Sequence, residues 1–399
     1  MKNNKVILIG SGVLLFLLSG GISYTVFGFF QSKEPAVVTP TPTENNGRTI
    51  LTTSGPKDQE CSINGAYFTK QERQVWESRR PLIAMIENHQ DSRPQSGLSK
   101  ADVVYEVVAE GGITRFMAVF YCRAAAGNLE KYDIGPVRSA RTYFLDWASE
   151  YGDYPLYTHV GGAGQCDDPT VHEDAKALCQ IGQYGWKDKG SRCDLDQFAL
   201  PYSICRREYE RTGKDVATEH TMYCDTYALW QEAETRGLTN ETKKTGDDWD
   251  KEFHAWLFKE DAQPDQRGEV ADISFSFWKN QSDYDVNWQY DQEENLYRRL
   301  NDDEKHIDFK TKEQLTAKTI VVLSMAERSG VDEHKHLLYE TIGDGQALVF
   351  QDGQVEEANW EKDSRTSRTR FFNVSGKEIS FNRGQIWMEI VPAGNKIKY

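Results

Sequence analysis

The stretch that most directs the interpretation of this chain is Gly135-Pro136-Val137-Arg138-Ser139-Ala140-Arg141. Gly-Pro is typical of a turn, and a proline at the first helical position gives up only an amide hydrogen that has no partner there. Apolar residues then recur at helical spacing, at Val137, Ala140, Phe144, Trp147, Ala148 and Tyr151. This spacing predicts one amphipathic helix over residues 136–151.

Arg138 and Arg141 stand three residues apart in the first turns of this predicted helix. The N-terminus of a helix is partly positive, so each cation there costs about 0.3–1 kcal/mol. An arginine pair in that place indicates a negative group nearby, because guanidinium groups bind carboxylates and phosphates at two points. That group is either a carboxylate of the same chain or an anionic ligand.

The chain is acidic: its 399 residues carry a formal net charge of −15 at pH 7. This charge argues against nucleic acid as a partner and against broad adhesion to anionic lipid, because both need a basic surface. Hydrophobic residues make up 38% of the chain, which is typical of globular proteins. The length is sufficient for two or three domains.

The N-terminal segment predicts export. The apolar run Val6–Phe30 carries no charge and is long enough to cross a bilayer. Lys2 and Lys5 precede it and should stay in the cytoplasm, which places the rest of the chain outside. A cleaved signal peptide with its apolar core over residues 6–18 is the alternative. Residues 1–32 are therefore a transmembrane anchor or signal segment, and we expect a single-pass protein of the cell membrane whose bulk is extracytoplasmic.

Seven cysteines stand in the first part of the chain: Cys61, Cys122, Cys166, Cys179, Cys193, Cys205 and Cys224. No pair has C-x-x-C spacing, which disfavours zinc and thioredoxin-like sites. In an exported chain some of them are expected to form disulfides, with buried free thiols as the alternative. The odd number leaves at least one thiol unpaired or bonded to another chain.

Two folded domains are expected after a linker. Residues 33–74 are polar and contain several prolines, so they predict an extracytoplasmic linker, which Cys61 could tether to the folded part. Residues 75–240 predict an α/β or α+β domain with a cysteine-containing insertion over residues 165–213. Its expected strands cover residues 81–86, 102–109, 113–122 and 156–160, the second and third forming a hairpin, and residues 226–236 read as a helix.

Residues 249–399 predict a mostly antiparallel β-domain. Alternating or apolar runs separated by turn residues indicate strands in residues 270–278, 288–297, 319–325, 348–355, 370–381 and 385–391. Turns are expected at Asp352-Gly353 and at Ser375-Gly376.

Three long motifs carry a family likeness: Arg93-Pro94-Gln95-Ser96-Gly97-Leu98-Ser99-Lys100-Ala101-Asp102, Glu110-Gly111-Gly112-Ile113-Thr114-Arg115-Phe116 and Ile134-Gly135-Pro136-Val137-Arg138-Ser139-Ala140-Arg141. With Arg383-Gly384-Gln385-Ile386-Trp387 near the end of the chain, they resemble the YerB-like family of bacterial envelope proteins. The likeness covers roughly residues 80–395, outside the cysteine-containing insertion. It implies a pair of N- and C-terminal domains of unknown function, and members of the family are often described as lipoproteins.

One feature departs from that family pattern. Leu18-Ser19-Gly20-Gly21 resembles a lipobox, but glycine stands where the lipidated cysteine would be. The resemblance therefore does not extend to a lipid anchor.

Five candidate ligand-binding residues are expected in loops, at strand ends and at a helix start, four of them in the family motifs: Arg93, Arg115, Arg138, Arg141 and, outside the motifs, His159. Such ends commonly meet at one edge of a sheet. The stem peptides of peptidoglycan carry carboxylates and lie within reach of an anchored exterior domain. The leading hypothesis is therefore an arginine-lined anion pocket that binds or remodels cell-wall material, a glycan or a stem peptide. In the rival interpretation, Arg138 and Arg141 pair with internal Glu106, Glu110 or Asp102 and only hold the fold.

Two residues are candidate catalytic groups. Glu110 beside Gly111-Gly112 could protonate a glycosidic oxygen if its pKa is raised, as in a peptidoglycan-cleaving hydrolase or lyase, and His220 could act as a base. Each also has a structural interpretation, as an ion-pair or turn residue and as a hydrogen-bonded histidine. No serine-nucleophile motif is present, His159, Cys166 and His172 fit no familiar metal spacing, and no cofactor is expected. A non-catalytic scaffold that docks another envelope protein is the alternative function.

Overall fold

The structure is a computed structural model that describes residues 43–45, 48–50, 55–126, 132–301 and 303–399. The predicted anchor or signal segment, residues 1–32, and the linker residues 33–42 lie outside the described residues. Among the residues that are described, no helix combines the length and the apolar character that a membrane crossing needs. Residues Glu44–Tyr399 form one compact unit.

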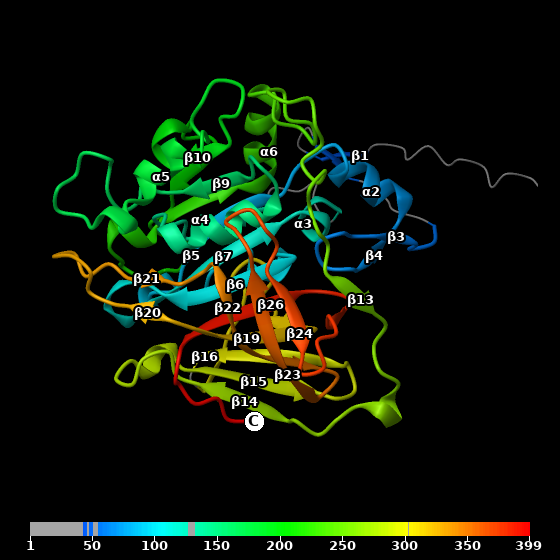
Figure 1. Cartoon of the computed structure of the whole chain (residues 1–399). Helices are drawn as coiled ribbons and strands as arrows, with labels where there is room; N and C mark the ends of the chain where they lie inside the picture. The colour runs from blue at the N-terminus through cyan, green and yellow to red at the C-terminus, as the bar shows by residue number, and fades with distance from the viewer. Residues whose placement is uncertain (1–42, 46–47, 51–54, 127–131, 302) are drawn as a thin grey trace, which may run out of the picture. The chain divides into compact units, whose positions relative to one another are not determined.

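A ten-stranded sheet organises this unit (Figure 1). Its strands in spatial order are β10 (Asp194–Asp196), β9 (Leu156–His159), β5 (Leu82–Glu87), β7 (Thr114–Phe120), β6 (Val103–Val108), β26 (Ile386–Pro392), β19 (Thr319–Met325), β22 (Gly343–Gln351), β23 (Gln354–Lys362) and β24 (Arg370–Asn373). The last strand of the chain, β26, runs parallel to β6 on one side and to β19 on the other. The two halves of the chain therefore share one sheet.

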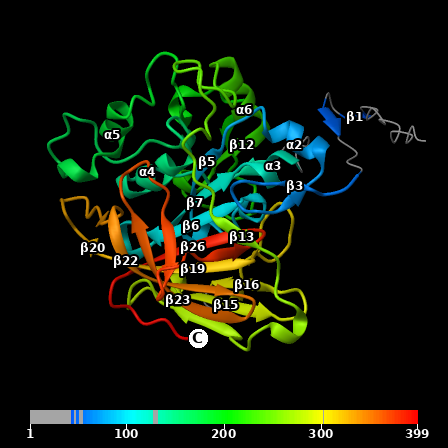
Figure 2. The same ribbon diagram turned by 45° about the vertical axis from the view of Figure 1, so that its right-hand side comes forward.

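A second sheet covers one face of the first. It contains β14 (Asp272–Phe275), β15 (Val286–Asp291), β16 (Leu296–Asn301), β17 (Glu304–Lys305) and β18 (Thr316–Ala317). Trp288 of β15 packs edge-on against Trp387 of β26, with ring centroids 5.1 Å apart. On the opposite face, Trp147 of helix α4 (Thr142–Ala148) stacks on Tyr105 of β6. Figure 2 shows α4 and the second sheet on opposite sides of β6 and β26.

Shorter elements complete the described chain. The remaining helices are α2 (Lys70–Trp76), α3 (Cys122–Ala126), α5 (Ala177–Gln183) and α6 (Thr226–Thr235), with 3-10 turns η1 (Gln90–Ser92), η2 (Leu98–Lys100), η3 (Glu110–Gly112), η4 (Ser149–Tyr151), η5 (Glu173–Ala175), η6 (Gln197–Ala199), η7 (Thr218–His220), η8 (Pro264–Gln266) and η9 (Ser282–Tyr284). The remaining strands are β1 (Thr43–Asn45), β2 (Arg48–Ile50), β3 (Gln59–Glu60), β4 (Tyr67–Phe68), β8 (Asp133–Ile134), β11 (Cys205–Arg207), β12 (Met222–Asp225), β13 (Leu257–Lys259), β20 (Glu327–Arg328), β21 (Leu338–Tyr339) and β25 (Ser380–Asn382).

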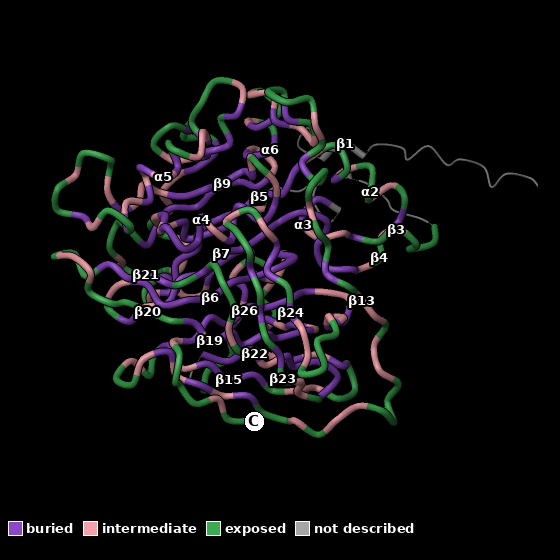
Figure 3. Tube along the Cα trace, viewed as in Figure 1, coloured by how far each residue is buried: buried purple, intermediate pink, exposed green. Residues whose placement is uncertain are grey.

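The predicted strands at the centre of the sheet are confirmed. Strands β5, β9 and β19 lie where apolar runs predicted them, and β6 and β7 form the expected hairpin through η3. Every residue of β5, β6 and β7 is buried, as the continuous purple of the sheet interior shows in Figure 3. Apolar runs of this kind are typical of strands covered on both faces. The turn at Asp352-Gly353 between β22 and β23 is also found.

The predicted helix over residues 136–151 is confirmed from Thr142 onward, where α4 is followed by η4, and is wrong for residues 136–141. Val137 forms a bridge with Ile86 of β5, and Ala140 forms a bridge with Gly162 just after β9. These pairings with distant strands outweigh a helical pattern that was read from local spacing. The argument from the positive end of a helix therefore does not apply to Arg138 or Arg141.

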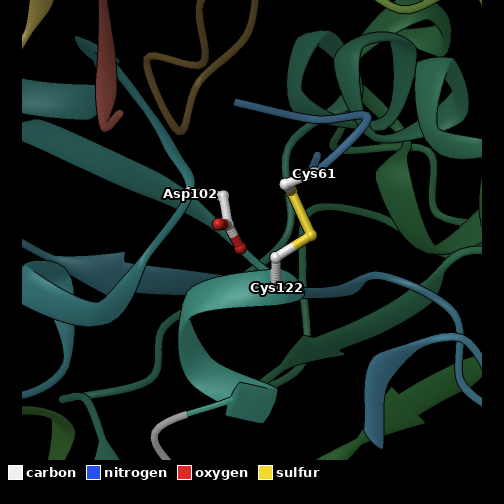
Figure 4. Close-up of side chains that lie close together, drawn as sticks. All are labelled: Cys61, Asp102 and Cys122. Carbon is white, nitrogen blue, oxygen red and sulfur yellow. A yellow bond between two sulfur atoms is a disulfide. The ribbon is translucent and has the colours of Figure 1, made fainter. Parts of the chain in front are cut away.

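The predicted linker also needs correction over its second half. Residues 59–68 form the strand pair β3–β4, and Cys61 and Ile63 are fully buried. A disulfide joins Cys61 to Cys122 at the start of α3 (Figure 4). Polar composition predicted an open chain, but the covalent tie and the buried side chains make these residues part of the folded unit.

Asp102 lies beside this disulfide, with its carboxylate directed toward it in Figure 4. The carboxylate accepts hydrogen bonds from the Asn64 side chain (2.7 Å) and the Tyr121 amide (2.6 Å). Burial raises the pKa of Asp102 to about 6, although the charge of Arg123 and the backbone amides of Arg123, Tyr121 and Cys122 oppose the shift. Asp102 therefore has a structural role and is not a partner of Arg138 or Arg141.

The expected disulfides are present. Besides Cys61–Cys122, the structure contains Cys166–Cys179 and Cys205–Cys224. Cys193 is buried and free, so the odd thiol stays inside the protein. The mostly antiparallel character expected of the C-terminal half holds for most pairs, but β26 pairs in parallel on both sides and β13 pairs in parallel with β25.

Candidate functional site

Residues 137–140 enter the sheet where the parallel strands β5 and β9 separate. On one side the Arg138 amide donates to the Met85 carbonyl oxygen (2.8 Å), and on the other side the Val160 amide donates to the Arg138 carbonyl oxygen (3.1 Å). Strand pairing, rather than a helix, therefore holds Arg138 and Arg141 at this end of the sheet.

Glu87, the last residue of β5, binds two of the predicted site residues. Arg138 Nε donates to Glu87 Oε1 (3.0 Å), and His220 Nδ1 lies 2.8 Å from Glu87 Oε2. This hydrogen bond raises the pKa of His220, so its proton faces the carboxylate. The His89 ring stacks on the His220 ring, with centroids 4.5 Å apart. Glu87 is buried, whereas 28% of the Arg138 side chain is exposed.

Glu110 binds the second arginine of the pair. Arg141 Nε and its terminal amine donate to the two oxygens of Glu110, at 2.5 and 2.7 Å, and the Arg115 guanidinium lies 3.9 Å away. Burial alone would raise the pKa of Glu110, but Arg141 and Arg115 lower it to about 2. Burial and Arg141 lower the pKa of Arg115 to about 10. Glu110 is therefore an ionised carboxylate between two guanidinium groups.

We call the six side chains of this region the rim cluster: Glu87, Glu110, Arg115, Arg138, Arg141 and His220. It is continuous, because Glu87 and Arg115 are register partners on β5 and β7. The Arg115 side chain also donates to the Ser139 carbonyl oxygen (2.9 Å), which ties β7 to the inserted segment.

His159 lies at the end of β9, and both of its ring nitrogens form hydrogen bonds within the protein. Its Nε2 is 2.6 Å from Asp194 Oδ1 and its Nδ1 is 2.7 Å from the Gly161 carbonyl oxygen. Both neighbours are acceptors, so both ring nitrogens donate and the ring is cationic. Burial opposes this charge, but the Asp194 contact raises the pKa of His159. His159 is sealed and paired, so the structure does not place it as a ligand-binding group.

Arg93 turns away from the rim. Its Nε donates to Asn88 Oδ1 (3.0 Å), its terminal amine donates to the Asp283 carbonyl oxygen (2.9 Å), and its guanidinium lies over the Tyr284 ring. It therefore joins the loop after β5 to the C-terminal half of the chain rather than to Arg138 and Arg141.

Asn88 leads from that loop to a second group of polar side chains on the other face of the sheet. We call this group the inner cluster: Asn88, Glu106, Arg299, His306 and Glu389. Asn88 Nδ2 donates to Glu106 Oε1 (3.1 Å), while Asn88 Oδ1 accepts from Gln95 (2.8 Å).

Two carboxylates and one guanidinium form the centre of the inner cluster. Glu106 of β6 and Glu389 of β26 are register partners. Arg299 of β16 binds Glu106 through a terminal amine, and its Nε lies 3.9 Å from Glu389. All three side chains are fully buried. Burial, followed by the charge of Glu106, raises the pKa of Glu389 well above its ordinary value.

His306 completes the inner cluster as a neutral ring. Arginine can only donate, so His306 Nδ1 accepts from Arg299 (2.6 Å) and Nε2 donates to Gln95 Oε1 (2.7 Å). Burial and Arg299 lower the pKa of His306 well below its ordinary value.

The structure thus brings together five of the seven predicted site residues: Glu110, Arg115, Arg138, Arg141 and His220. His159 and Arg93 are bound elsewhere. The role of general acid predicted for Glu110 does not fit the structure. A general acid needs a raised pKa, whereas the pKa of Glu110 is lowered to about 2. Arg141 pairs with Glu110, one of the acids named in the structural interpretation, whereas the acid that pairs with Arg138 is Glu87.

Sequence reasoning missed Glu87, His89, Arg299, His306 and Glu389. Glu87 and His89 had a signal, because a charged and a polar residue directly follow the apolar strand of residues 81–86. Side chains alternate along a strand, so Glu87 and His89 are expected on one face of the sheet and Asn88 on the other. Arg299 and Glu389 had none, because each lies in an ordinary strand pattern and meets its partner only across two layers.

The comparisons with known proteins match this architecture. Residues 68–239 match the N-terminal domain, and residues 273–388 the C-terminal domain, of a family described as "Protein of unknown function (DUF3048)". The chain is 28% identical over 327 residues to "Putative lipoprotein YerB" of Bacillus subtilis (strain 168), which covers 81% of this chain and 84% of that protein. The crystal structure of YerB protein from Bacillus subtilis matches with a TM-score of 0.64 at 24% identity, over 86% of this chain and 100% of that chain, and so has the same fold. The chain therefore belongs to the YerB-like family, whose members combine the N- and C-terminal domains of this description.

Proposed function

We propose that this chain is a membrane-associated, extracytoplasmic envelope protein that binds carboxylate-bearing cell-wall material at Arg138, without cleaving it. The carboxylates of peptidoglycan stem peptides are the ligand class with the matching charge and place. The proposal retains the arginine-based anion site and narrows it to the one arginine of the predicted pair that keeps donors toward solvent.

The observation that carries the proposal is the asymmetric use of Arg138. Glu87 accepts from its Nε, and 28% of the side chain is exposed. Among the described residues, no hydrogen-bond partner is seen for its terminal amines. Arg141 differs, because both oxygens of Glu110 and the Ala140 carbonyl oxygen already use its donors. A guanidinium held at one nitrogen and open at two can accept a carboxylate in the bidentate mode.

The cellular location rests on independent features. Three disulfides fit an oxidising compartment outside the cytoplasm. The relative from Bacillus subtilis carries the name of a lipoprotein. The sequence adds the apolar segment Val6–Phe30 as a possible anchor.

Binding rather than cleavage is favoured by the state of Glu110. A carboxylate with a pKa of about 2 does not deliver a proton near neutral pH. His220 Nδ1–H donates a hydrogen bond to Glu87, so the chain itself orients this ring before any ligand is present.

The test is a titration of the full-length protein in detergent with defined muropeptides, in the presence of a chelator. Arg138→Gln should weaken binding at least about tenfold, the loss of a charge-assisted bidentate contact. Arg328→Gln is the matched control, because Arg328 is a surface arginine with 60% of its side chain exposed. Muropeptides whose carboxylates are amidated should bind the wild-type protein as weakly as unmodified muropeptides bind Arg138→Gln.

Two outcomes would overturn this function. One is a wild-type protein that does not bind muropeptides. The other is an Arg138→Gln protein that melts at the wild-type temperature and binds them equally well. Either result would favour the scaffold alternative, in which the arginines only support the fold. Release of soluble fragments from peptidoglycan, detected by mass spectrometry, would contradict the non-catalytic part of the proposal.

A further inference from the structure

Among the described residues the same local motif occurs twice, and in one copy alone a third potential metal ligand lies close by. His89 caps η1 and accepts from the Asp91 amide (3.2 Å), and His172 caps η5 and accepts from the Asp174 amide (3.2 Å). In both copies the histidine Nδ1 lies close to the aspartate carboxylate, at 3.6 and 3.8 Å. This His-x-Asp proximity follows from the cap itself, so the motif alone does not make a site.

The first copy differs by the presence of His220. The His220 ring stacks on His89 with an interplanar angle of 12°. One ligand atom each from His89, Asp91 and His220 all lie within 4.8 Å of one another. Among the described residues, one other group meets this criterion, Cys61, Asp102 and Cys122, and a disulfide already consumes its two sulfurs.

His220 is oriented as a metal ligand would be. Its Nδ1 faces Glu87 (2.8 Å), so in the neutral ring Nδ1–H donates to Glu87 and Nε2 carries the lone pair that a metal ion would take. A histidine that binds a metal almost always donates its other N–H to a carboxylate or a carbonyl group. Glu87 is itself fixed by Arg138 on its second oxygen, so the ring is held from behind.

We infer that His89, Asp91 and His220 form a binding site for a divalent transition metal ion of the zinc class. Two imidazoles and one carboxylate are the donor set of open, three-ligand metal centres. His89 is partly exposed and Asp91 is exposed, so further coordination positions face solvent.

The stacked rings set a requirement for binding. A ring nitrogen binds a metal in the plane of its ring, and two nearly parallel rings cannot both do so without one of them turning. His89 is the ring that turns, because 31% of its side chain is exposed, whereas His220 is held by Glu87. Metal binding therefore replaces the stack.

The charges also indicate what a bound ion would take as its next ligand. The Asp91 carboxylate would neutralise one positive charge of the ion, whereas the negative charge of Glu87 is already neutralised by Arg138. A divalent ion would leave the site with one positive charge, which favours an anionic ligand at the open position. This site goes beyond the proposed function, because it needs no cell-wall ligand to form.

The experiment uses full-length protein that has been stripped with a chelator and dialysed. Zn²⁺ is titrated by calorimetry, and Co²⁺ is titrated by visible absorption. One equivalent should bind, and His89→Ala and Asp91→Asn should each weaken binding at least about tenfold. His172→Ala is the matched control, because it removes the same cap residue from the copy that lacks a third ligand, and it should leave the affinity unchanged.

A further variant tests orientation. Glu87→Gln should weaken Zn²⁺ binding by about 10- to 100-fold, the usual effect of removing the group behind a metal-bound histidine. The inference is overturned if stripped wild-type protein binds no ion at micromolar concentration. It is equally overturned if His89→Ala and His172→Ala reduce binding to the same extent. The muropeptide titration contains a chelator, so failure of either proposal leaves the other measurable.

Discussion

The rim cluster and the inner cluster lie on opposite faces of the ten-stranded sheet and combine carboxylates with guanidinium groups in different ratios. At the rim, one carboxylate, Glu110, stands between Arg141 and Arg115. In the inner cluster, one guanidinium, Arg299, stands between the carboxylates of Glu106 and Glu389. The pKa of Glu110 is lowered to about 2, whereas the pKa of Glu389 is raised well above its ordinary value.

The difference shows that burial alone does not decide the charge state of a carboxylate. Burial acts to raise the pKa of both Glu110 and Glu389, and in each case it is the largest single contribution. At the rim two cations reverse that effect. In the inner cluster a single cation lies between two carboxylates and does not reverse the effect of burial, so the pKa of Glu389 stays raised.

The clusters also differ in what they can do. The inner cluster joins β6, β16 and β26, and its charged side chains have no exposed surface. The rim cluster keeps part of Arg138 and Glu110 exposed, at 28% and 21% of their side chains. The inner cluster therefore fits a role in holding the two halves of the chain together, and the rim cluster is the one that solvent and ligands can reach.

The largest expected effect comes from removing the single cation of the inner cluster. Arg299→Met should lower the free energy of unfolding by about 3–5 kcal/mol, because it leaves a charged carboxylate buried without a partner. The measurement is urea unfolding at pH 7. Arg298→Met is the matched control on the same strand, since 38% of the Arg298 side chain is exposed and its ion pair should contribute less than about 1 kcal/mol. Equal losses in the two variants would contradict the contrast between sealed and exposed clusters.

The rim should show a smaller loss with a distinct pH dependence. Glu110→Gln should cost about 3 kcal/mol at pH 7, because the folded pKa of about 2 lies below the ordinary value of 4.5. A lowered carboxylate pKa stabilises the fold above the ordinary value, and this contribution is lost as the pH falls from about 4.5 toward 2. The variant should therefore lose part of the acid-induced decrease in stability that the wild type shows.

The control for this pH measurement is Glu77→Gln. Glu77 pairs with Arg73 on the surface, where about half of each side chain is exposed. Its loss should change stability by less than about 1 kcal/mol and leave the acid slope as in the wild type. An unchanged slope in Glu110→Gln would show that the two arginines do not hold this carboxylate ionised.

The smallest difference separates the two acids of the inner cluster. Glu106→Gln removes the carboxylate that Arg299 binds through a terminal amine and should cost about 2 kcal/mol, less than the loss of Arg299, because the carboxyl group of Glu389 still lies near the guanidinium. Glu389→Gln replaces the acid with the raised pKa by an amide of the same size and should cost less than about 1 kcal/mol. Unfolding of both variants at pH 7 measures this order. The reverse order would contradict the raised pKa of Glu389.

Local pattern was sufficient for most of the secondary structure. The apolar runs at residues 81–86 and 319–325 and the hairpin around Glu110 needed no tertiary information, because strands covered on both faces are apolar throughout. It failed at residues 136–141, where the spacing of Val137 and Ala140 fits a helix but the backbone pairs with β5 and β9. Helical spacing over six residues is a weak preference that distant hydrogen bonds override.

The sequence by itself determined the central strands and indicated the family, and it favoured disulfides and a negative group near the arginines of the family motifs. Only the tertiary structure decided which acids they meet, how many cations share each acid and which side chain remains open to solvent. Arg299 lies 193 residues from Glu106, and His220 lies 133 residues from Glu87. Charge state depends on such neighbours and on burial, and neither quantity is encoded in local spacing.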